Sequence, residues 1–313
     1  MAKKNSSDEK LSKKERRRRI AELIEPFRVT RGKGFSLRDY DPDDSLDIAT
    51  KESADDLLRQ GVLQLARMQD KLYAQDQWGV LLIFQAMDAA GKDGAIRHVL
   101  SGVNPQGCQV FSFKAPSAEE RDHTYLWRSM KALPERGRIG IHNRSYYEEV
   151  LVARVHKEIL AAQQLPERLK GHGIWKRRFR EICDFEQYLC DNGTVIVKFF
   201  LHVSKDEQRR RFLARIDEED KNWKFSVGDA KERAFWDDYM EAYEDMLEHT
   251  STPHAPWYVV PADNKWFTRL AVAAILWQTM ADLDLEFPKV TDEKKKELQE
   301  VRRMLISEDD NKG

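Results

Sequence analysis

This sequence of 313 residues has almost no excess of charge of either sign, no long apolar run and few cysteines. The counts of Lys+Arg (53) and Asp+Glu (54) leave a formal net charge of −1, which argues against binding of nucleic acid or of a membrane surface through overall charge. The longest apolar run, residues 270–277, is far shorter than the roughly 20 residues that cross a bilayer. Cys108, Cys183 and Cys190 are odd in number and lack metal-binding spacing, which indicates a reducing compartment. We therefore expect a cytoplasmic protein without a nucleic-acid or membrane partner.

Neither an internal repeat nor a Pro- or Gly-rich linker divides the chain, and 41% hydrophobic residues are enough for a core. We expect a single catalytic domain over residues 21–290. Residues 1–20 are interpreted as a mobile basic arm, which serves either as a solubilising tail or as an electrostatic contact for a polyanion. Residues 291–313 are expected to form a charged C-terminal helix or tail.

Five short apolar segments recur along the chain and alternate with helical patterns. Several are continuous rather than alternating, as strands buried on both faces are. Between them, the Ser-x-x-Glu spacings that begin at Ser117, Ser145 and Ser204 predict capping boxes at three helix starts. Residues 53–75 have the periodicity of an amphipathic helix. Strands that alternate with helices indicate βαβ units, so we expect an α/β protein whose parallel sheet carries helices on both faces. The predicted strands are 79–84, 108–113, 138–143, 194–200 and 256–261.

The stretch "LLIFQAMDAAGKDGAIRHVL" runs from an apolar strand through a turn into a helix. Gly91 and Lys92 fit the phosphate-loop pattern G-x-x-x-x-G-K-[ST], whereas Ala86 replaces its first Gly and Asp93 its Ser/Thr. Backbone N–H groups of such a turn converge on an anion at the N-terminus of the next helix. The alternative is an ordinary strand-to-helix turn with an exposed Lys. The strand–turn–helix context favours a phosphate site.

Asp88 lies inside this loop. A carboxylate beside a phosphate site repels the phosphate unless a divalent cation lies between them. The sequence therefore makes Asp88 the candidate ligand of Mg²⁺, with Mn²⁺ as an alternative.

A second polar cluster, "IGIHNRSYYEE", follows the third predicted strand. Asn143 can orient water or a substrate oxygen but is a poor ligand for a hard metal, and Arg144 can bind phosphate oxygens and stabilise charge during transfer. His142 is expected to pack at the strand end. Alternatively, Ser145 caps a helix and Arg144 is merely solvated. Because ligands bind at the carboxyl ends of parallel strands, we expect this cluster, the phosphate loop and "FKAPS" to share one edge of the sheet.

Basic residues are concentrated in two predicted helices and the segment that follows them. Solvated helix faces explain such runs in most proteins. In a nearly neutral chain, the same residues could line a groove for a long polyanion, with the last segment as a mobile lid. The residues concerned are Lys176, Arg177, Arg178, Arg209, Arg210, Arg211, Arg215, Lys221 and Lys224.

Taken together, these pieces resemble the polyphosphate kinase 2 family. The matching motifs are "MDAAGKDG", "FKAPS", "NRSYYEE", "KNWKFS" and "APWYVVPADNKWFTRL", which cover roughly residues 25 to 285 in order. Ala86 and Asn143 stand where the commoner family pattern has Gly and Asp, and this resembles the third class of the family, described as phosphorylating nucleoside mono- and diphosphates. The missing Asp leaves the second metal ligand open.

The resemblance implies a three-layer α/β/α core like that of thymidylate kinases, with a five-stranded parallel sheet and a helical lid around residues 204–235. It implies transfer of the terminal phosphoryl group of inorganic polyphosphate to AMP and ADP, with guanine nucleotides as further candidates, by a homo-oligomer. Asp88, Lys92, Asn143 and Arg144 would be catalytic, with Asp88 on Mg²⁺. The phosphates and the polyphosphate chain would contact Ala90, Gly91, Asp93, Gly94, Lys176, Arg177, Arg178, Arg209, Arg210, Lys221 and Lys224. The acceptor nucleotide would contact Lys114, Asn143, Arg144, Glu148 and Arg154.

Two other functions fit parts of the sequence. An ATP-dependent nucleotide or small-molecule kinase of the same fold would use the same loop, but ATP needs an adenine pocket where polyphosphate needs a basic track. A non-catalytic module that binds polyanions would need the basic helices but has no use for Asp88. The number of cations between residues 176 and 224 favours polyphosphate as the donor.

Overall fold

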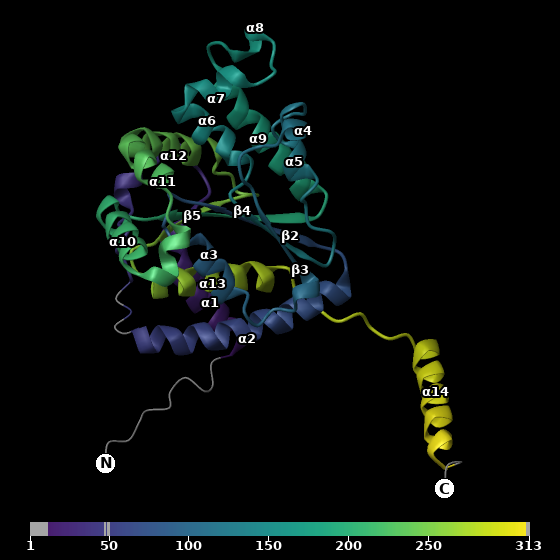
Figure 1. Cartoon of the computed structure of the whole chain (residues 1–313). Coiled ribbons are helices and arrows are strands. Elements are labelled where there is room, and N and C mark those ends of the chain that lie inside the picture. Colours follow the sequence, from purple (N-terminus) through teal and green to yellow (C-terminus); the bar gives the residue numbers. More distant parts are fainter. Residues whose placement is uncertain (1–11, 47, 49–50, 311–313) are drawn as a thin grey trace, which may run out of the picture.

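The computed structural model describes residues 12–46, 48 and 51–310, except for the side chains of residues 13, 51–53, 224 and 308–310. A six-stranded sheet lies at the centre of the folded protein, with the strands in the order β1-β6-β5-β2-β4-β3 (Figure 1). Its strands are Arg28–Val29 (β1), Gly79–Gln85 (β2), Cys108–Ser112 (β3), Ile139–Asn143 (β4), Thr194–His202 (β5) and Trp257–Pro261 (β6).

The five predicted strands are all present and all parallel. β2 is buried along its whole length, in agreement with its continuous apolar sequence. The predicted sheet was incomplete, because the two-residue strand β1 pairs antiparallel with β6 at the edge. Two residues are too few to show an alternating pattern, so nothing in the sequence signals this strand.

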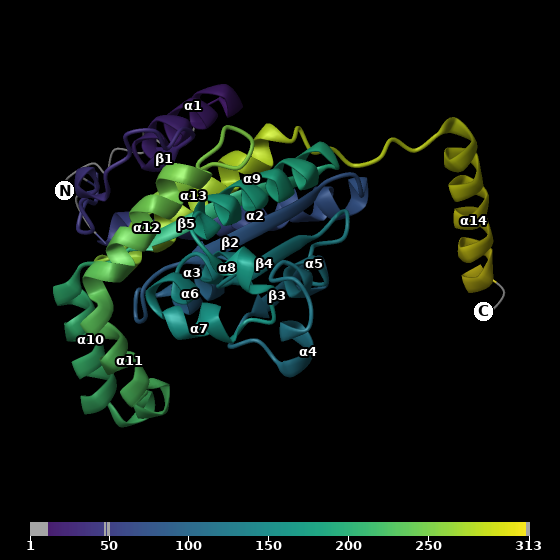
Figure 2. The ribbon, with the colours of Figure 1, turned by 90° about the horizontal axis from the view of Figure 1, so that it is seen from above.

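Helices cover both faces of the sheet, which gives the expected three layers (Figure 1), and Figure 2 looks down on one helical layer with the sheet behind it. One face carries α1 (Lys13–Ile24), α2 (Lys51–Gln75), α3 (Lys92–Val99) and α13 (Lys265–Asp282), and the other carries α9 (Ile174–Asp191) and α12 (Trp236–Thr250). Within the region predicted as a lid lie α10 (Lys205–Asp217), the 3₁₀ helix η5 (Glu219–Lys224), α11 (Val227–Glu232) and η6 (Arg233–Phe235). The short helices elsewhere are η1 (Glu25–Phe27), η2 (Leu37–Asp39), η3 (Pro105–Gly107), α4 (Ala118–Arg121), α5 (Trp127–Met130), η4 (Tyr146–Glu149), α6 (Val152–Val155), α7 (Lys157–Ala162) and α8 (Glu167–Lys170).

The two ends of the described chain behave differently. Part of the span predicted as a mobile arm is helical: Ser12 and Glu15 form a capping box, and Ile20 packs against the core, so α1 is fixed to the body of the protein. The rest of that arm, residues 1–11, lies outside the described residues. The charged C-terminal segment forms helix α14 (Asp292–Asp310), which stands away from the sheet (Figure 1). Among the described helices, none is both long and apolar enough to span a membrane.

The three predicted capping boxes differ in outcome. Ser117 and Glu120 form a complete box. Ser145 caps the 3₁₀ helix η4 through the N–H of Tyr147. Ser204 accepts a hydrogen bond from the backbone of Glu207, but the carboxylate of Glu207 pairs with arginines of α10.

Candidate active site

The phosphate loop connects β2 to α3 at the carboxyl edge of the sheet. Gly91 is the N-cap of α3 at φ 110°, a conformation that favours glycine, and Ala89 also has a positive φ of 62°. The ammonium of Lys92 turns back over the loop and donates hydrogen bonds to the carbonyls of Ala86 (2.7 Å) and Met87 (3.4 Å). Burial lowers the pKa of Lys92, and the carboxylate of Asp88 opposes this shift.

The end of β4 lies directly beside this loop, because Phe84 of β2 pairs with Asn143 of β4. The guanidinium of Arg144 forms an ion pair with Asp88 at 3.0 Å. The side-chain amide of Asn143 donates to the carboxylate of Asp93 at 2.6 Å. Two of the three clusters predicted at this edge are therefore in direct contact.

The third cluster contributes less. Lys114 follows β3 and its side chain is exposed; its backbone carbonyl accepts a hydrogen bond from Arg128 (2.7 Å). His142 is fully buried, with its ring 3.0 Å from the carbonyl of Ala132, so its predicted packing role is confirmed.

Glu148 completes the polar group around the loop. Burial raises its pKa against the opposing effects of Arg144, Lys92 and Gln85. Tyr243 of α12 also faces this group: burial and then Glu148 raise its pKa. Neither Gln85 nor Tyr243 was among the predicted site residues, and their positions within a strand and a helix carry no motif.

Helix α10 holds the loop from behind. Arg211 is buried, and its guanidinium donates to the carbonyls of Ala89 (3.0 Å) and Ala90 (2.7 Å) as well as to two carbonyls after β6. Gln208 donates to the carbonyl of Asp88 at 3.0 Å. Arg211 is therefore a structural support of the phosphate loop, rather than the groove-lining cation that the sequence indicated.

Several other basic residues of this region lie nearer the surface, whereas Arg215 is 24% exposed and pairs with Asp229 at 3.7 Å. Arg209 and Arg210 are 64% and 68% exposed and pair with Asp206 (3.8 Å) and Glu207 (3.0 Å) of their own helix. Lys221 pairs with Glu218. The side chain of Lys224 lies outside the described residues.

The basic cluster of α9 is divided between surface and interior. Lys176 is exposed, whereas Arg177 donates to the carbonyl of Leu169. Arg178 is buried and bonds to Glu149 at 3.1 Å and to Glu181 at 3.0 Å. Its guanidinium is bonded to these two carboxylates and its side chain is only 9% exposed, which argues against the polyphosphate contact predicted for Arg178.

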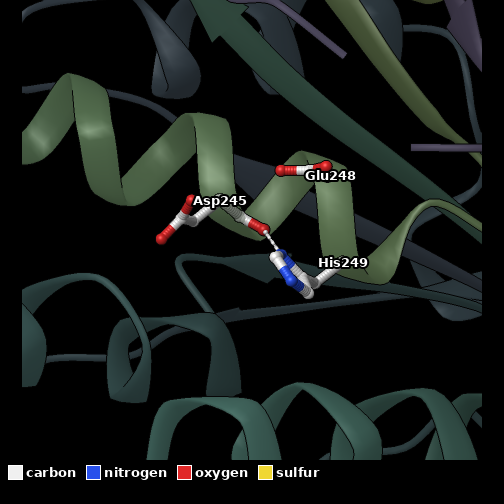
Figure 3. A group of neighbouring side chains, drawn as sticks. All are labelled: Asp245, Glu248 and His249. Carbon is white, nitrogen blue, oxygen red and sulfur yellow. Dashed lines mark hydrogen bonds between the residues drawn. The ribbon is translucent and has the colours of Figure 1, made fainter. Parts of the chain in front are cut away.

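Arg154 also has acidic partners, Asp245 at 2.5 Å and Glu241 at 3.4 Å. Asp245, Glu248 and His249 form the one group of three metal-ligand side chains among the described residues whose ligand atoms lie within 4.8 Å of one another (Figure 3). Asp245 is already paired with Arg154, and the ring of His249 is 2.9 Å from the backbone carbonyl of Asp245. Asp245 and His249 therefore already have partners within the protein.

Comparison with known proteins agrees with this geometry. The chain matches the family model "Polyphosphate kinase 2 (PPK2)" over residues 49–288. It is 54% identical over 281 residues to the ADP-polyphosphate phosphotransferase of Rhodopseudomonas palustris, covering 90% of this chain and 97% of that protein. It is 44% identical over 267 residues to the AMP/ADP-polyphosphate phosphotransferase of Meiothermus ruber, covering 85% and 96%. A crystal structure of polyphosphate kinase 2 from Arthrobacter aurescens superposes with a TM-score of 0.82 at 42% identity, over 91% of this chain and 96% of that one. The chain belongs to the polyphosphate kinase 2 family.

Proposed function

We propose that this protein transfers the terminal phosphoryl group of inorganic polyphosphate to nucleotides, converting AMP to ADP and ADP to ATP. The observation that carries the proposal is the contact between the phosphate loop and Arg144 at the neighbouring strand end. Family relatives are named for this chemistry, one with ADP alone and one with AMP and ADP as acceptors.

The chain's own residues supply position and charge. The N–H groups at the start of α3 and the ammonium of Lys92 would bind the donor phosphates, and Arg144 would bridge donor and acceptor. The transition state of phosphoryl transfer is loose, so stabilising its spread negative charge is the main task of the protein. The chain needs no nucleophile of its own for this reaction.

A divalent cation fits the residues of the loop. Asp88 offers a carboxylate next to the phosphate site, and Mg²⁺ is commonly held by one or two carboxylates together with substrate phosphates. When bound, Mg²⁺ neutralises charge on the transferring group. Asp88 would hold it, and Arg144 would be released from Asp88 to contact phosphate. Glu148 is a further carboxylate near Lys92 and Arg144.

The direct test is an assay without ATP. Wild-type protein with Mg²⁺, long-chain polyphosphate and either AMP or ADP should form ADP and then ATP from AMP, and ATP from ADP. A Lys92→Met variant should lose most of this activity while it keeps its melting temperature. If only ADP is consumed, the proposal fails for AMP. If phosphate is transferred from ATP but not from polyphosphate, the protein is an ATP-dependent kinase of the same fold.

A further inference from the structure

A fully buried ion pair lies behind the segment that carries Arg144. Lys198 of β5 and Glu186 of α9 have no exposed surface, and their charged atoms are 2.6 Å apart. Apolar residues of similar volume can replace such pairs in other proteins without loss of stability, because taking two charges out of water is costly. Stability alone is therefore a weak reason for this pair.

The pair fixes two adjacent tyrosines of η4. The ammonium of Lys198 donates to Glu186, to the carbonyl of Thr250 (2.8 Å) and to the hydroxyl oxygen of Tyr147 (3.0 Å), which uses all three of its N–H groups. The second oxygen of Glu186 accepts hydrogen bonds from Tyr146 (2.8 Å) and Tyr147 (2.7 Å). Since these bonds are directional, the network is satisfied by one placement of the two rings.

The placement of these rings limits the position of the Arg144 backbone, because a single residue separates Arg144 from Tyr146. Arg144 has a φ of 63°, in the left-handed region that residues with side chains rarely adopt. Such a conformation persists only where the surrounding structure determines it from several sides. On one side, the N–H of Arg144 donates to the carbonyl of Phe84 in β2 (3.1 Å). On the other side, the tyrosines are held by the buried pair.

We propose that the Lys198–Glu186 pair positions Arg144 for phosphoryl transfer, acting through the hydroxyls of Tyr146 and Tyr147. The inference rests on the function proposed above. Lys198 and Glu186 touch no reacting atom, so they are positioning residues. Without these directional bonds, η4 can shift within an intact core, and a small displacement of Arg144 is enough to impair transfer.

A double-mutant cycle tests this in the full chain, with the variants Tyr147→Phe, Arg144→Ala and their combination. Tyr147→Phe should lower kcat about tenfold and leave the KM for ADP within twofold. In the Arg144→Ala background, the same change should cause no further loss, because the two residues act through one geometry. As a control, Ile275→Val removes one methylene from a fully buried position of α13 on the other face of the sheet. It should lower the melting temperature and leave kcat within twofold.

A second arm replaces the pair itself, as Lys198→Met with Glu186→Leu. If this variant folds, it should show the same loss of kcat as Tyr147→Phe. Should Tyr147→Phe fail to fold, Tyr146→Phe removes a single hydrogen bond to Glu186 and completes the same cycle.

The outcomes separate the two proposals. Absence of transfer by the wild type refutes the proposed function and the inference with it. Transfer by the wild type, combined with losses that add in the cycle or with full activity of the tyrosine variant, refutes the positioning role alone.

Discussion

Replacing Asp88 with Asn tests whether the charge of this carboxylate serves phosphoryl transfer. The substitution keeps the size of the side chain, so the loop should keep its path. Asp88 and Arg144 form a partly exposed pair, with 29% and 42% of their side chains accessible. Such pairs contribute about 0.2–1 kcal/mol to the free energy of unfolding. For a chain of this size, the melting temperature should therefore change by about 4 °C or less.

The expected effect on catalysis is larger. Loss of a charge that holds Mg²⁺ at the transferring group should lower turnover by about 10²-fold, which corresponds to about 2.7 kcal/mol of transition-state stabilisation. The variant should also need a higher Mg²⁺ concentration for half-maximal activity. The assay measures turnover with ADP and polyphosphate across a Mg²⁺ titration, together with the melting temperature.

A matched control is Asp282→Asn, because Asp282 of α13 also forms a partly exposed pair, with Arg17 at 2.5 Å. It should change stability by a similar amount and leave turnover unaltered. An Asp88→Asn variant that turns over within a few-fold of wild type would refute the role of the charge. Reduced turnover with an unchanged Mg²⁺ requirement would instead show that Asp88 acts by orienting Arg144. The structure makes this second outcome a real alternative, since Arg144 already balances the charge of Asp88.

Four further predictions concern individual basic residues and one buried histidine. Replacing the exposed Arg209 and Arg210 with Gln should raise the KM for long polyphosphate more than the KM for ADP, without a change in melting temperature. Equal effects on the two KM values would show that these arginines belong to a solvated helix face and do not bind polyphosphate. Neutralising Arg178 should instead lower the melting temperature, because a buried carboxylate loses its partner, and turnover measured well below that temperature should persist. Arg211→Lys should lower both stability and turnover, since an ammonium cannot reach all the carbonyls that the planar guanidinium bonds, and a variant with wild-type values would contradict its role as a loop support. Burial lowers the pKa of His142 from 6.5 to about 4, so this residue binds fewer protons in the folded than in the unfolded state. The free energy of unfolding should therefore fall as the pH drops from 6.5 towards 4. In a pH series of thermal melts, His142→Gln should make this fall smaller without abolishing it, because burial also lowers the pKa of His202 to about 4.

The sequence was a good guide to the fold because the five parallel strands are short, apolar and separated by helices. Their predicted boundaries differ from the observed ones by at most two residues. It was a poor guide where tertiary pairing decides the outcome. Strand β1 exists because β6 lies beside it, and its own two residues carry no pattern.

For the site, the sequence could predict which strand ends meet, but not which side chains pair there. Parallel topology brings the residues after β2 and β4 to one edge, and the structure confirms that the loop and Arg144 meet there. Which side chains pair at that edge depends on rotamers and loop conformation, so the contacts Asp88–Arg144 and Asn143–Asp93 could not be predicted.

Helix geometry could have separated the three adjacent arginines of α10. Successive residues of a helix point about 100° apart, so Arg209, Arg210 and Arg211 cannot share a face. Arg211 lies three residues after the buried Gln208, and both belong to the face directed at the phosphate loop. A count of cations treated the three residues alike, whereas their spacing assigns one to the interior and two to solvent.

The contacts of α10 with the loop help to explain how the loop forms without the first Gly and the Ser/Thr of the usual pattern. The first glycine is replaceable because Ala86, directly after β2, is buried and does not have a positive φ; the left-handed positions fall on Ala89 and Gly91. Arg211 holds the carbonyls of Ala89 and Ala90, so that side of the loop is fixed by another element. Asp93 stands where the usual loop has a Ser or Thr hydroxyl, and its carboxylate accepts a hydrogen bond from Asn143 of the neighbouring strand β4. If the loop binds a cation, as proposed above, Asp88 is the carboxylate left to hold it, and Arg144 would then have to move from this carboxylate to the phosphate.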